Sequence, residues 1–189
     1  MKSLRILIYS LLVMLIFGTF VSKAQIPSFR VGIYDFVSNT ASEVYVLAPT
    51  VIFGYDVWNR SQLDLQISSG FSFNRTRYNS HYHYLYLIPF LATVYYNLPN
   101  PSAKVWPSIG MGMSLLWKAD YNKDFDKTHY SLAYGFNATG RLNIPLKGDL
   151  LLVLEMTYNL MIPPVMEEVN LSGVILTAGL NFPAKHVKQ

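Results

Sequence analysis

Two long segments near the end of the chain alternate between apolar and polar residues with a period of two. One face of residues 131–144 carries Leu132, Tyr134, Phe136, Ala138, Gly140, Leu142 and Ile144. After a turn at residues 145–149, an apolar face resumes with Leu150, Leu152, Leu154, Met156, Tyr158 and Leu160. This period is typical of β-strands rather than helices. Each arm is also long enough to cross a bilayer as a tilted strand, which takes roughly 9–11 residues.

The first 24 residues have the pattern of a secretory leader. Lys2 and Arg5 give a basic start, residues 6–21 are almost wholly apolar, and small residues precede the end of the segment. We expect cleavage between Ala24 and Gln25, which leaves residues 25–189 as one barrel domain. The alternative is an uncleaved membrane anchor, for which the apolar run is short.

Charge is scarce in this chain and is concentrated in the leader. Charged residues make up 14% of the sequence, against roughly 25% in soluble domains. Removing the three basic residues of the leader lowers the net charge from +4 to +1, so the basic pI does not predict nucleic-acid binding. Cysteine is absent, which excludes disulfides and a lipid-modified cysteine anchor.

Eight strands are predicted after the leader. They cover residues 29–37, 44–58, 63–78, 82–98, 105–119, 128–144, 150–161 and 171–182. The fourth strand contains Pro89, where we expect a bulge or a local distortion because proline lacks the N–H donor. No apolar run of about 20 residues follows the leader. The chain is therefore predicted to be all-β, an eight-stranded antiparallel up-and-down transmembrane barrel, in which closure pairs every backbone group.

The polar face of the predicted strands is assigned to the barrel interior. This face carries eight of the nine strand glycines, which suits a narrow lumen, together with Arg30, Asp56, Asp64, Arg141 and Glu155. The turn at residues 145–149 places Ile144 opposite Leu152 and Arg141 opposite Glu155. We predict a charge-assisted pair between the latter two in a filled, non-conducting lumen. A narrow channel is the alternative.

The connections differ between the two ends of the predicted barrel. Export places the N-terminus in the periplasm, so the turns at residues 59–62, 99–104 and 145–149 are predicted to be periplasmic. The connections at residues 38–43, 79–81, 120–127 and 162–170 are predicted to face outward, and the longest and most charged connection is among them. The sequence therefore favours a structural, adhesive or ligand-binding role through the outer loops.

Three motifs resemble those of the small eight-stranded outer-membrane barrels of Gram-negative bacteria, the group that includes the OmpA-type transmembrane domain. They are PSIGMGM at residues 107–113, YGFNATGRL at residues 134–142 with the strand that follows, and LTAGLNF at residues 176–182. The resemblance implies location in the outer membrane, contact with its lipid and lipopolysaccharide, and insertion by the barrel-assembly machinery through the closing strand that ends at Phe182. Residues 86–91 and the Ala-Gln start are similar to barrels from Bacteroidetes-like bacteria.

Two clusters near the predicted outer rim could bind ligands. Arg75, Arg77, His81 and His83 would form a basic, aromatic edge suited to lipopolysaccharide phosphates. The alternatives for this edge are a solvated rim and metal binding by the two histidines. The alternating acids of residues 120–126 resemble the start of a calcium loop but lack its glycine and its bidentate glutamate. We expect no metal and no cofactor.

His129 and Ser131 raise the question of an enzyme, because some barrels of the resembled group are lipid A acyltransferases or deacylases. Residues two apart on a strand have Cα atoms about 6.5 Å apart, so contact between their side chains is allowed but not enforced. No family-type catalytic motif surrounds them. The prediction is a protein that is not an enzyme, with lipid A modification as the alternative function. The sequence does not indicate an oligomeric state.

Overall fold

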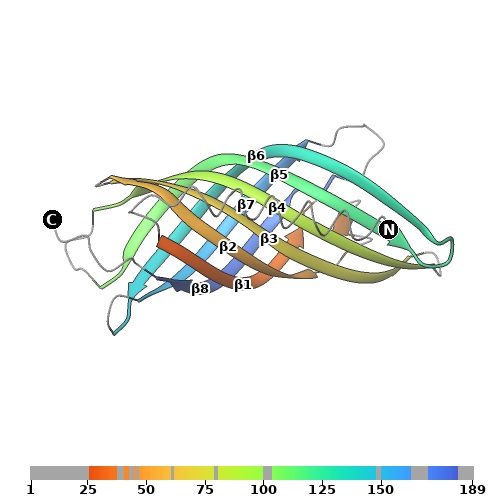
Figure 1. Ribbon diagram of the computed structural model, residues 1–189, viewed down its shortest axis with the longest axis horizontal. Helices are drawn as coiled ribbons and strands as arrows, with labels where there is room; N and C mark the ends of the chain where they lie inside the picture. The colour runs from red at the N-terminus through yellow and green to blue at the C-terminus, as the bar shows by residue number, and fades with distance from the viewer. Residues whose placement is uncertain are drawn as a thin grey trace, which may run out of the picture.

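The chain forms a closed antiparallel barrel of eight strands joined in sequence order (Figure 1). The computed structural model describes residues 26–37, 41–42, 45, 47–60, 62–78, 81–99, 104–147, 150–162 and 170–182, without the side chains of Arg60, Arg77, Tyr78 and His81. The strands are β1 (Ile26–Phe36), β2 (Leu47–Arg60), β3 (Leu63–Tyr78), β4 (His81–Asn97), β5 (Trp106–Asn122), β6 (Lys127–Pro145), β7 (Leu151–Ile162) and β8 (Gly173–Asn181). Pairing of β1 with β8 closes the barrel, which confirms the predicted fold class.

The two ends of the barrel differ in length and in their connections. We call the end with the β1–β2, β3–β4, β5–β6 and β7–β8 connections the loop end, and the opposite end the turn end. Strands β3, β4, β5 and β6 reach beyond the other strands at the loop end (Figure 1). The β5–β6 hairpin stays paired up to Asn122 and Lys127, which is further than the sequence predicted.

Two other strand boundaries differ from the predicted ones. β2 begins at Leu47 instead of residue 44. Tyr45, which the sequence pattern places in this strand, is 3% exposed and packs inside the barrel. β1 begins at Ile26, earlier than predicted, because Ile26 and Pro27 still pair with β2.

Pro89 interrupts the β3–β4 ladder without shifting its register. The pairs Ser69–Phe90 and Ser72–Leu87 flank a gap in the ladder and share one register. The expected local distortion is therefore present, but it is not a bulge. The register shift in this part of the barrel lies instead between β2 and β3, from Asp56 to Trp58.

Side chains alternate between the interior and the outer surface along most of each strand. In β6 and β7, buried residues at odd positions alternate with exposed residues at even positions over most of each strand. On the outer face of β5, Ile109, Met111 and Met113 are 56%, 74% and 66% exposed. The structure thus turns its apolar faces outward, as predicted. Within the described residues, no helix has the length and apolar character needed to span a membrane.

Candidate functional site in the barrel interior

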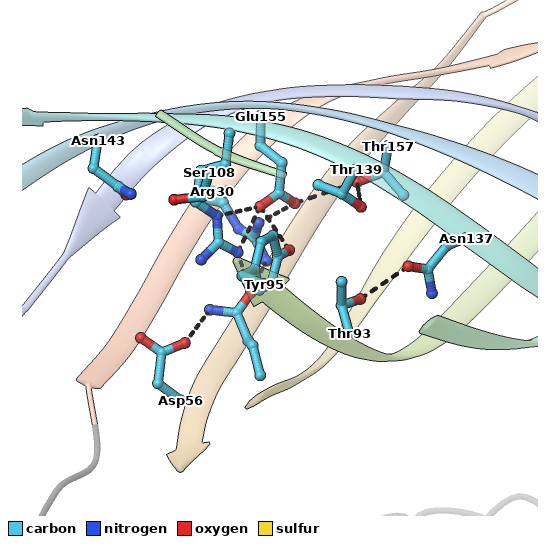
Figure 2. Close-up of polar contacts among 12 residues, drawn as sticks. Arg30, Asp56, Thr93, Tyr95, Ser108, Asn137, Thr139, Asn143, Glu155 and Thr157 are labelled. Carbon is cyan, nitrogen blue, oxygen red and sulfur yellow. Dashed lines mark hydrogen bonds and ion pairs between the residues drawn. The ribbon is translucent and has the colours of Figure 1, made fainter. Parts of the chain in front are cut away.

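Glu155 lies at the centre of a buried ionic network in the half of the interior nearer the turn end (Figure 2). The register predicted from the hairpin is the one observed, with Arg141 of β6 opposite Glu155 of β7. Nη2 and Nε of Arg141 lie 2.6 Å and 2.7 Å from Oε2 of Glu155. Arg30 of β1 forms an ion pair with Oε1 of the same carboxylate. One glutamate therefore holds two guanidinium groups from strands far apart in the sequence.

Gln66 of β3 links this centre to a second acid. Its amide oxygen accepts hydrogen bonds from Arg30 at 3.1 Å and from Arg141 at 2.6 Å. Its amide nitrogen donates to Oδ1 of Asp56 at 2.6 Å. The network thus contains two cations and two anions, all at most 5% exposed. Its formal charge is zero, which limits the cost of burying it.

Tyr95 of β4 completes the network. Its hydroxyl donates to Oε2 of Glu155 at 3.1 Å, and its ring lies 3.7 Å from the guanidinium carbon of Arg141. Sequence reasoning missed Tyr95 and Gln66 because neither carries a charge. The available signal was their position on the inward face of β4 and β3, counted in steps of two.

Asp64 belongs to a different cluster from the other four predicted charges. Its Oδ2 accepts a 2.6 Å hydrogen bond from the amide of Asn97. The oxygen of that amide accepts a hydrogen bond from the hydroxyl of Ser108, also at 2.6 Å. The structure therefore brings Arg30, Asp56, Arg141 and Glu155 together and places Asp64 beside them in a chain of neutral partners at the turn end.

A layer of amides and hydroxyls follows toward the loop end. Thr93 donates to Asn137 at 3.0 Å (Figure 2), and Ser114 donates to Asn159 at 2.8 Å. Asn137 also donates to Ser114 at 3.2 Å. These hydrogen bonds connect four strands, β4, β5, β6 and β7, through side chains that lie in the interior.

An apolar cluster, which the sequence did not predict, lies in the interior nearer the loop end, beside buried polar side chains such as Thr50, Ser72 and Asn74. The cluster consists of Tyr34, Phe36, Ala41, Tyr45, Ala48, Ile52, Leu85, Leu87, Leu116, Ala133, Met161, Leu171 and Ile175. Ala41 and Tyr45 come from the β1–β2 connection, so these two residues of the connection pack inside the barrel. The described interior is therefore occupied by an ionic network, a layer of amides and hydroxyls, and an apolar cluster.

Tyr45 joins the apolar cluster to a polar mouth at the loop end. Its hydroxyl donates a 2.7 Å hydrogen bond to Oδ2 of Asp120 in β5. Burial raises the pKa of Tyr45 well above its ordinary value, and the charge and hydrogen bond of Asp120 add to the shift. The other oxygen of Asp120 lies 3.4 Å from Nδ1 of His83, whose Nε2 lies 3.4 Å from the amide of Asn122.

An open cavity of about 530 Å³ lies at this mouth. It is lined by His83, Asp120, Asn122, Phe125, Lys127, Thr128 and His129. One inward step below Asp120 lies Lys118, which is 6% exposed. The two interior cations predicted from the sequence did not include Lys118. Continuing the count by two from Ser114 would have found it.

Two residues of the predicted basic rim, Arg75 and His83, lie on different faces of the barrel wall. Arg75 is on the outer face of β3 and stacks over the rings of Tyr82 and Tyr84, 4.9 Å and 5.6 Å from their centroids. His83 instead faces the mouth and Asp120. Arg77 and His81 lie at the ends of β3 and β4, and their side chains are outside the described part of the chain.

His129 and Ser131 both lie on the inner face of β6. Their cross-strand partners on β5 are Asp120 and Lys118. The predicted leader and its cleavage point at Ala24 and Gln25 fall outside the described residues. Within those residues, no group of three or more His, Cys, Asp and Glu side chains is placed to hold a metal ion.

The acids of the β5–β6 hairpin have separate partners. Asp120 bonds inside the barrel to Tyr45. Asp124 accepts from the backbone N–H of Tyr82 at 3.1 Å, and Asp126 accepts from the hydroxyl of Tyr121, also at 3.1 Å. These carboxylates do not converge on a common centre, in contrast to the ligands of a calcium loop.

Three solved structures with low sequence identity share this architecture. Neisserial surface protein A is 17% identical, with a TM-score of 0.63 over 86% of this chain and 98% of that chain. A major outer membrane protein from Thermus thermophilus is 11% identical, with a TM-score of 0.64 over 85% and 99%. The N-terminal β-barrel domain of Pseudomonas aeruginosa OprF is 10% identical, with a TM-score of 0.52 over 85% and 97%. No family model and no curated protein matches the sequence. The chain has the fold of these outer-membrane barrels, as its motifs implied.

Proposed function

We propose that this chain is an integral protein of a bacterial outer membrane that acts through its loop end and does not conduct ions. The outer face of β5 carries the observation that supports membrane insertion. On this face an exposed apolar run, Ile109, Met111, Met113 and Leu115, leads to Trp117, and Trp106 is exposed at the opposite end of the strand. Eleven residues of a strand tilted by about 40° rise about 28 Å, which matches the apolar band of a bilayer with aromatic residues at both interfaces.

The distribution of charge supports the same proposal. Among the described residues, acidic and basic side chains on the outward faces are confined to the ends of the strands, as with Asp35 of β1 and Arg75 of β3. A basic residue facing lipid at the midplane costs about 2–4 kcal/mol. The charges that lie at membrane depth are instead turned inward, where Arg30 and Arg141 form ion pairs with Glu155.

The closed interior favours a non-conducting barrel. The network around Glu155 crosses the lumen from β1 to β6 and β7. The apolar cluster nearer the loop end adds a second layer of packed side chains to the lumen. A conducting state would require both layers to open together, and an ion passing the apolar layer would lose its hydration.

The loop end supplies the surface for a structural, adhesive or ligand-binding role. Arg75, stacked on Tyr82 and Tyr84, presents a guanidinium at the level where lipid phosphates would lie. We assign it a contact with lipopolysaccharide phosphate, with Arg77 and His81 as further contacts. The closing strand would be recognised by the barrel-assembly machinery through Phe182, which is 43% exposed.

Surface proteolysis tests the orientation. A protease site built into Lys123–Asp126, the turn between β5 and β6, should be cut in intact cells, which places the loop end outside. Cleavage only after the periplasm is opened would overturn the proposed orientation. The same site placed at residues 99–104, between β4 and β5, is the matched control and should resist the protease in intact cells.

Conductance and lipid analysis test the remaining parts. The purified barrel should leave planar bilayers silent, and discrete single-channel currents would contradict the closed lumen. Lipid A from cells that lack the protein should have an unchanged mass spectrum. Altered acylation that requires His129 and Ser131 would instead establish the enzymatic alternative.

A further inference from the structure

An open groove of about 470 Å³ crosses the outer face of the barrel wall over β6, β7, β8 and β1, which are consecutive around the closed sheet. Its sides are outward-facing apolar residues, namely Val31, Leu142, Leu154, Met156, Leu176 and Ala178. Glu155 and Thr177 also border it but are only 5% and 6% exposed, because their side chains point into the interior. The groove therefore consists of apolar side chains above a floor of strand backbone.

Gly140 is the reason that the wall is hollow at this position. It is the strand glycine that the sequence pattern places on the apolar, outward face, whereas a Cβ on the inward Gly32, Gly112 or Gly135 would collide with a backbone carbonyl oxygen. A Cβ built on Gly140 would meet no atom of the described residues within 4 Å. Close approach of strands inside a narrow lumen accounts for the inward glycines, but packing within the barrel does not account for Gly140.

The groove runs between two rows of cross-strand neighbours. The rows are Gly140, Met156 and Leu176, and, nearer the turn end, Leu142, Leu154, Ala178 and Val31. Successive rows on one face of a sheet are about 6.6 Å apart, and bulky side chains close such a gap. Here Gly140 supplies no side chain and Ala178 supplies one methyl group, so the gap stays open.

The depth of the groove in the wall indicates what can fill it. Gly140 pairs with Ile109 of β5 and Leu142 pairs with Pro107, so the groove lies level with the part of the apolar run that is nearer the turn end. At that depth the surroundings are hydrocarbon when the barrel is inserted as proposed above, and the present inference rests on that insertion. A groove in hydrocarbon is filled because its lining atoms gain dispersion contacts, not because apolar atoms leave water.

Two other occupants fit the groove less well. A helix is about 10–12 Å across, so a volume of about 470 Å³ holds only about one of its turns. A second copy of the barrel in a two-fold symmetric dimer would place this groove against the same groove of the other copy, which leaves the hollow empty. The flexible acyl chain of a membrane lipid can follow the groove and meets neither objection.

We propose that the groove opened by Gly140 binds one acyl chain of a phospholipid from the leaflet at the turn end. The headgroup of this lipid lies at the turn-end interface, while its chain passes between the two rows of side chains. In the proposed orientation this leaflet is the periplasmic one. The outer face of β5 differs, because Met111 and Met113 protrude there and are 74% and 66% exposed.

Retention of phospholipid by a groove-filling variant tests the proposal. The purified barrel is folded into nanodiscs of phosphatidylethanolamine and phosphatidylglycerol, transferred to a mild non-ionic detergent and weighed with its bound lipid by native mass spectrometry. Wild type should retain a single phospholipid, and Gly140→Leu should retain at least about fivefold less because its side chain takes the place of the acyl chain. Ala138→Leu is the matched control. It enlarges an exposed residue on the same face of β6 that does not line the groove, and it should retain lipid within about twofold of wild type.

Cross-linking locates the bound chain and separates this inference from the proposed membrane insertion. Barrels in the same nanodiscs are irradiated with a trace of phosphatidylcholine that carries a diazirine in the middle of one acyl chain, and the labelled residues are mapped by mass spectrometry. In Gly140→Leu, labelling of Met156 and Leu176 should fall at least about fivefold, while labelling of Met111 and Met113 should stay within about twofold. Equal labelling of the groove in both proteins would overturn the groove alone. Absence of labelling on both faces would contradict the insertion itself, and the groove with it.

Ala178→Leu provides a second route in case Gly140→Leu fails to fold, because it fills the groove from β8. It should likewise lose the retained phospholipid and the labelling of Met156. Equal retention of phospholipid by wild type and the folded groove variants would refute the site. A complex of two chains that the groove variants convert to single chains would assign the groove to a second copy, and would also overturn the proposal.

Discussion

The hydroxyl of Tyr45 donates a 2.7 Å hydrogen bond to Oδ2 of Asp120, which ties the β1–β2 connection to the inner face of β5. The ring of Tyr45 packs 5.7 Å from that of Phe36. The same side chain therefore caps the apolar cluster with its ring and contacts the polar mouth with its hydroxyl. Through this contact, a residue of the β1–β2 connection helps to close the interior at the loop end.

Alkaline pH should weaken the barrel through Tyr45. Because its pKa is raised in the folded state, the folded chain keeps the phenol proton at pH values where the unfolded chain loses it. The stabilisation is complete below about pH 10, the ordinary tyrosine pKa, and declines as the pH rises above it. Urea unfolding from about pH 8 to about pH 11.5 should show a steeper loss for wild type than for Tyr45→Phe. Equal slopes would show that the phenol ionises freely.

Removing one arginine of the ionic network should be costly. Arg141→Met leaves Glu155 buried with a weaker set of partners, and breaking a buried pair typically costs about 3–5 kcal/mol. The urea midpoint and the heat-dependent gel mobility of the barrel should both fall. Arg75→Met removes the same group from an exposed position and should change the stability by less than about 1 kcal/mol. Similar losses of stability in the two variants would mean that burial does not strengthen the interactions of Arg141.

The β5–β6 turn contains one strained residue. Among the described residues other than glycine, Asp126 has a positive φ, at 50°. Asp126→Val should destabilise the barrel by about 1–2 kcal/mol, because a β-branched residue is disfavoured in this region. Asp126→Gly should be neutral or slightly stabilising. Lys123→Val is the control in the same turn and should have little effect, so equal losses at residues 123 and 126 would exclude backbone strain as the cause.

Two glycines on opposite faces should respond differently to the same change. A Cβ at Gly112, on the inner face of β5, would collide with the backbone carbonyl oxygen of Ala92, whereas a Cβ at Gly140 on the outer face would meet no atom within 4 Å. Gly112→Ala should cost about 1–3 kcal/mol, the usual range for overpacking. Gly140→Ala should be neutral or stabilising. Refolding yield and urea midpoint measure both, and a large loss at Gly140 would mean that this surface is covered by a partner.

The sequence was sufficient to predict the barrel and the register of its β6–β7 hairpin. Alternation of apolar and polar residues assigns each side chain to one of two faces, and a short turn sets the pairing of its two arms. Arg141 and Glu155 could therefore be placed opposite each other without coordinates. The distribution of charge also indicated which face lies inward, because basic and acidic side chains are energetically unfavourable in lipid.

Contacts across the lumen could not be predicted in this way. Gln66 binds Arg141, and Asp56 joins the network through Gln66. Both come from strands whose positions around the barrel, and whose heights, depend on how all eight strands close. The separation of Asp64 from that network has the same origin. Local patterns record only the face of a residue, whereas the distance between two inward side chains is set by the tilt and stagger of the closed sheet.

The sequence by itself determined the strand count, the lipid-facing surface and one ion pair, since each depends on periodicity or on a short turn. The tertiary structure alone decided that Tyr45 packs inside the barrel, that an apolar cluster lies in the lumen in addition to the ionic network, and that Lys118 is buried below the mouth at the loop end. These features arise where segments that are distant in the chain meet inside a closed barrel. Which side chains bury one another there depends on the whole fold.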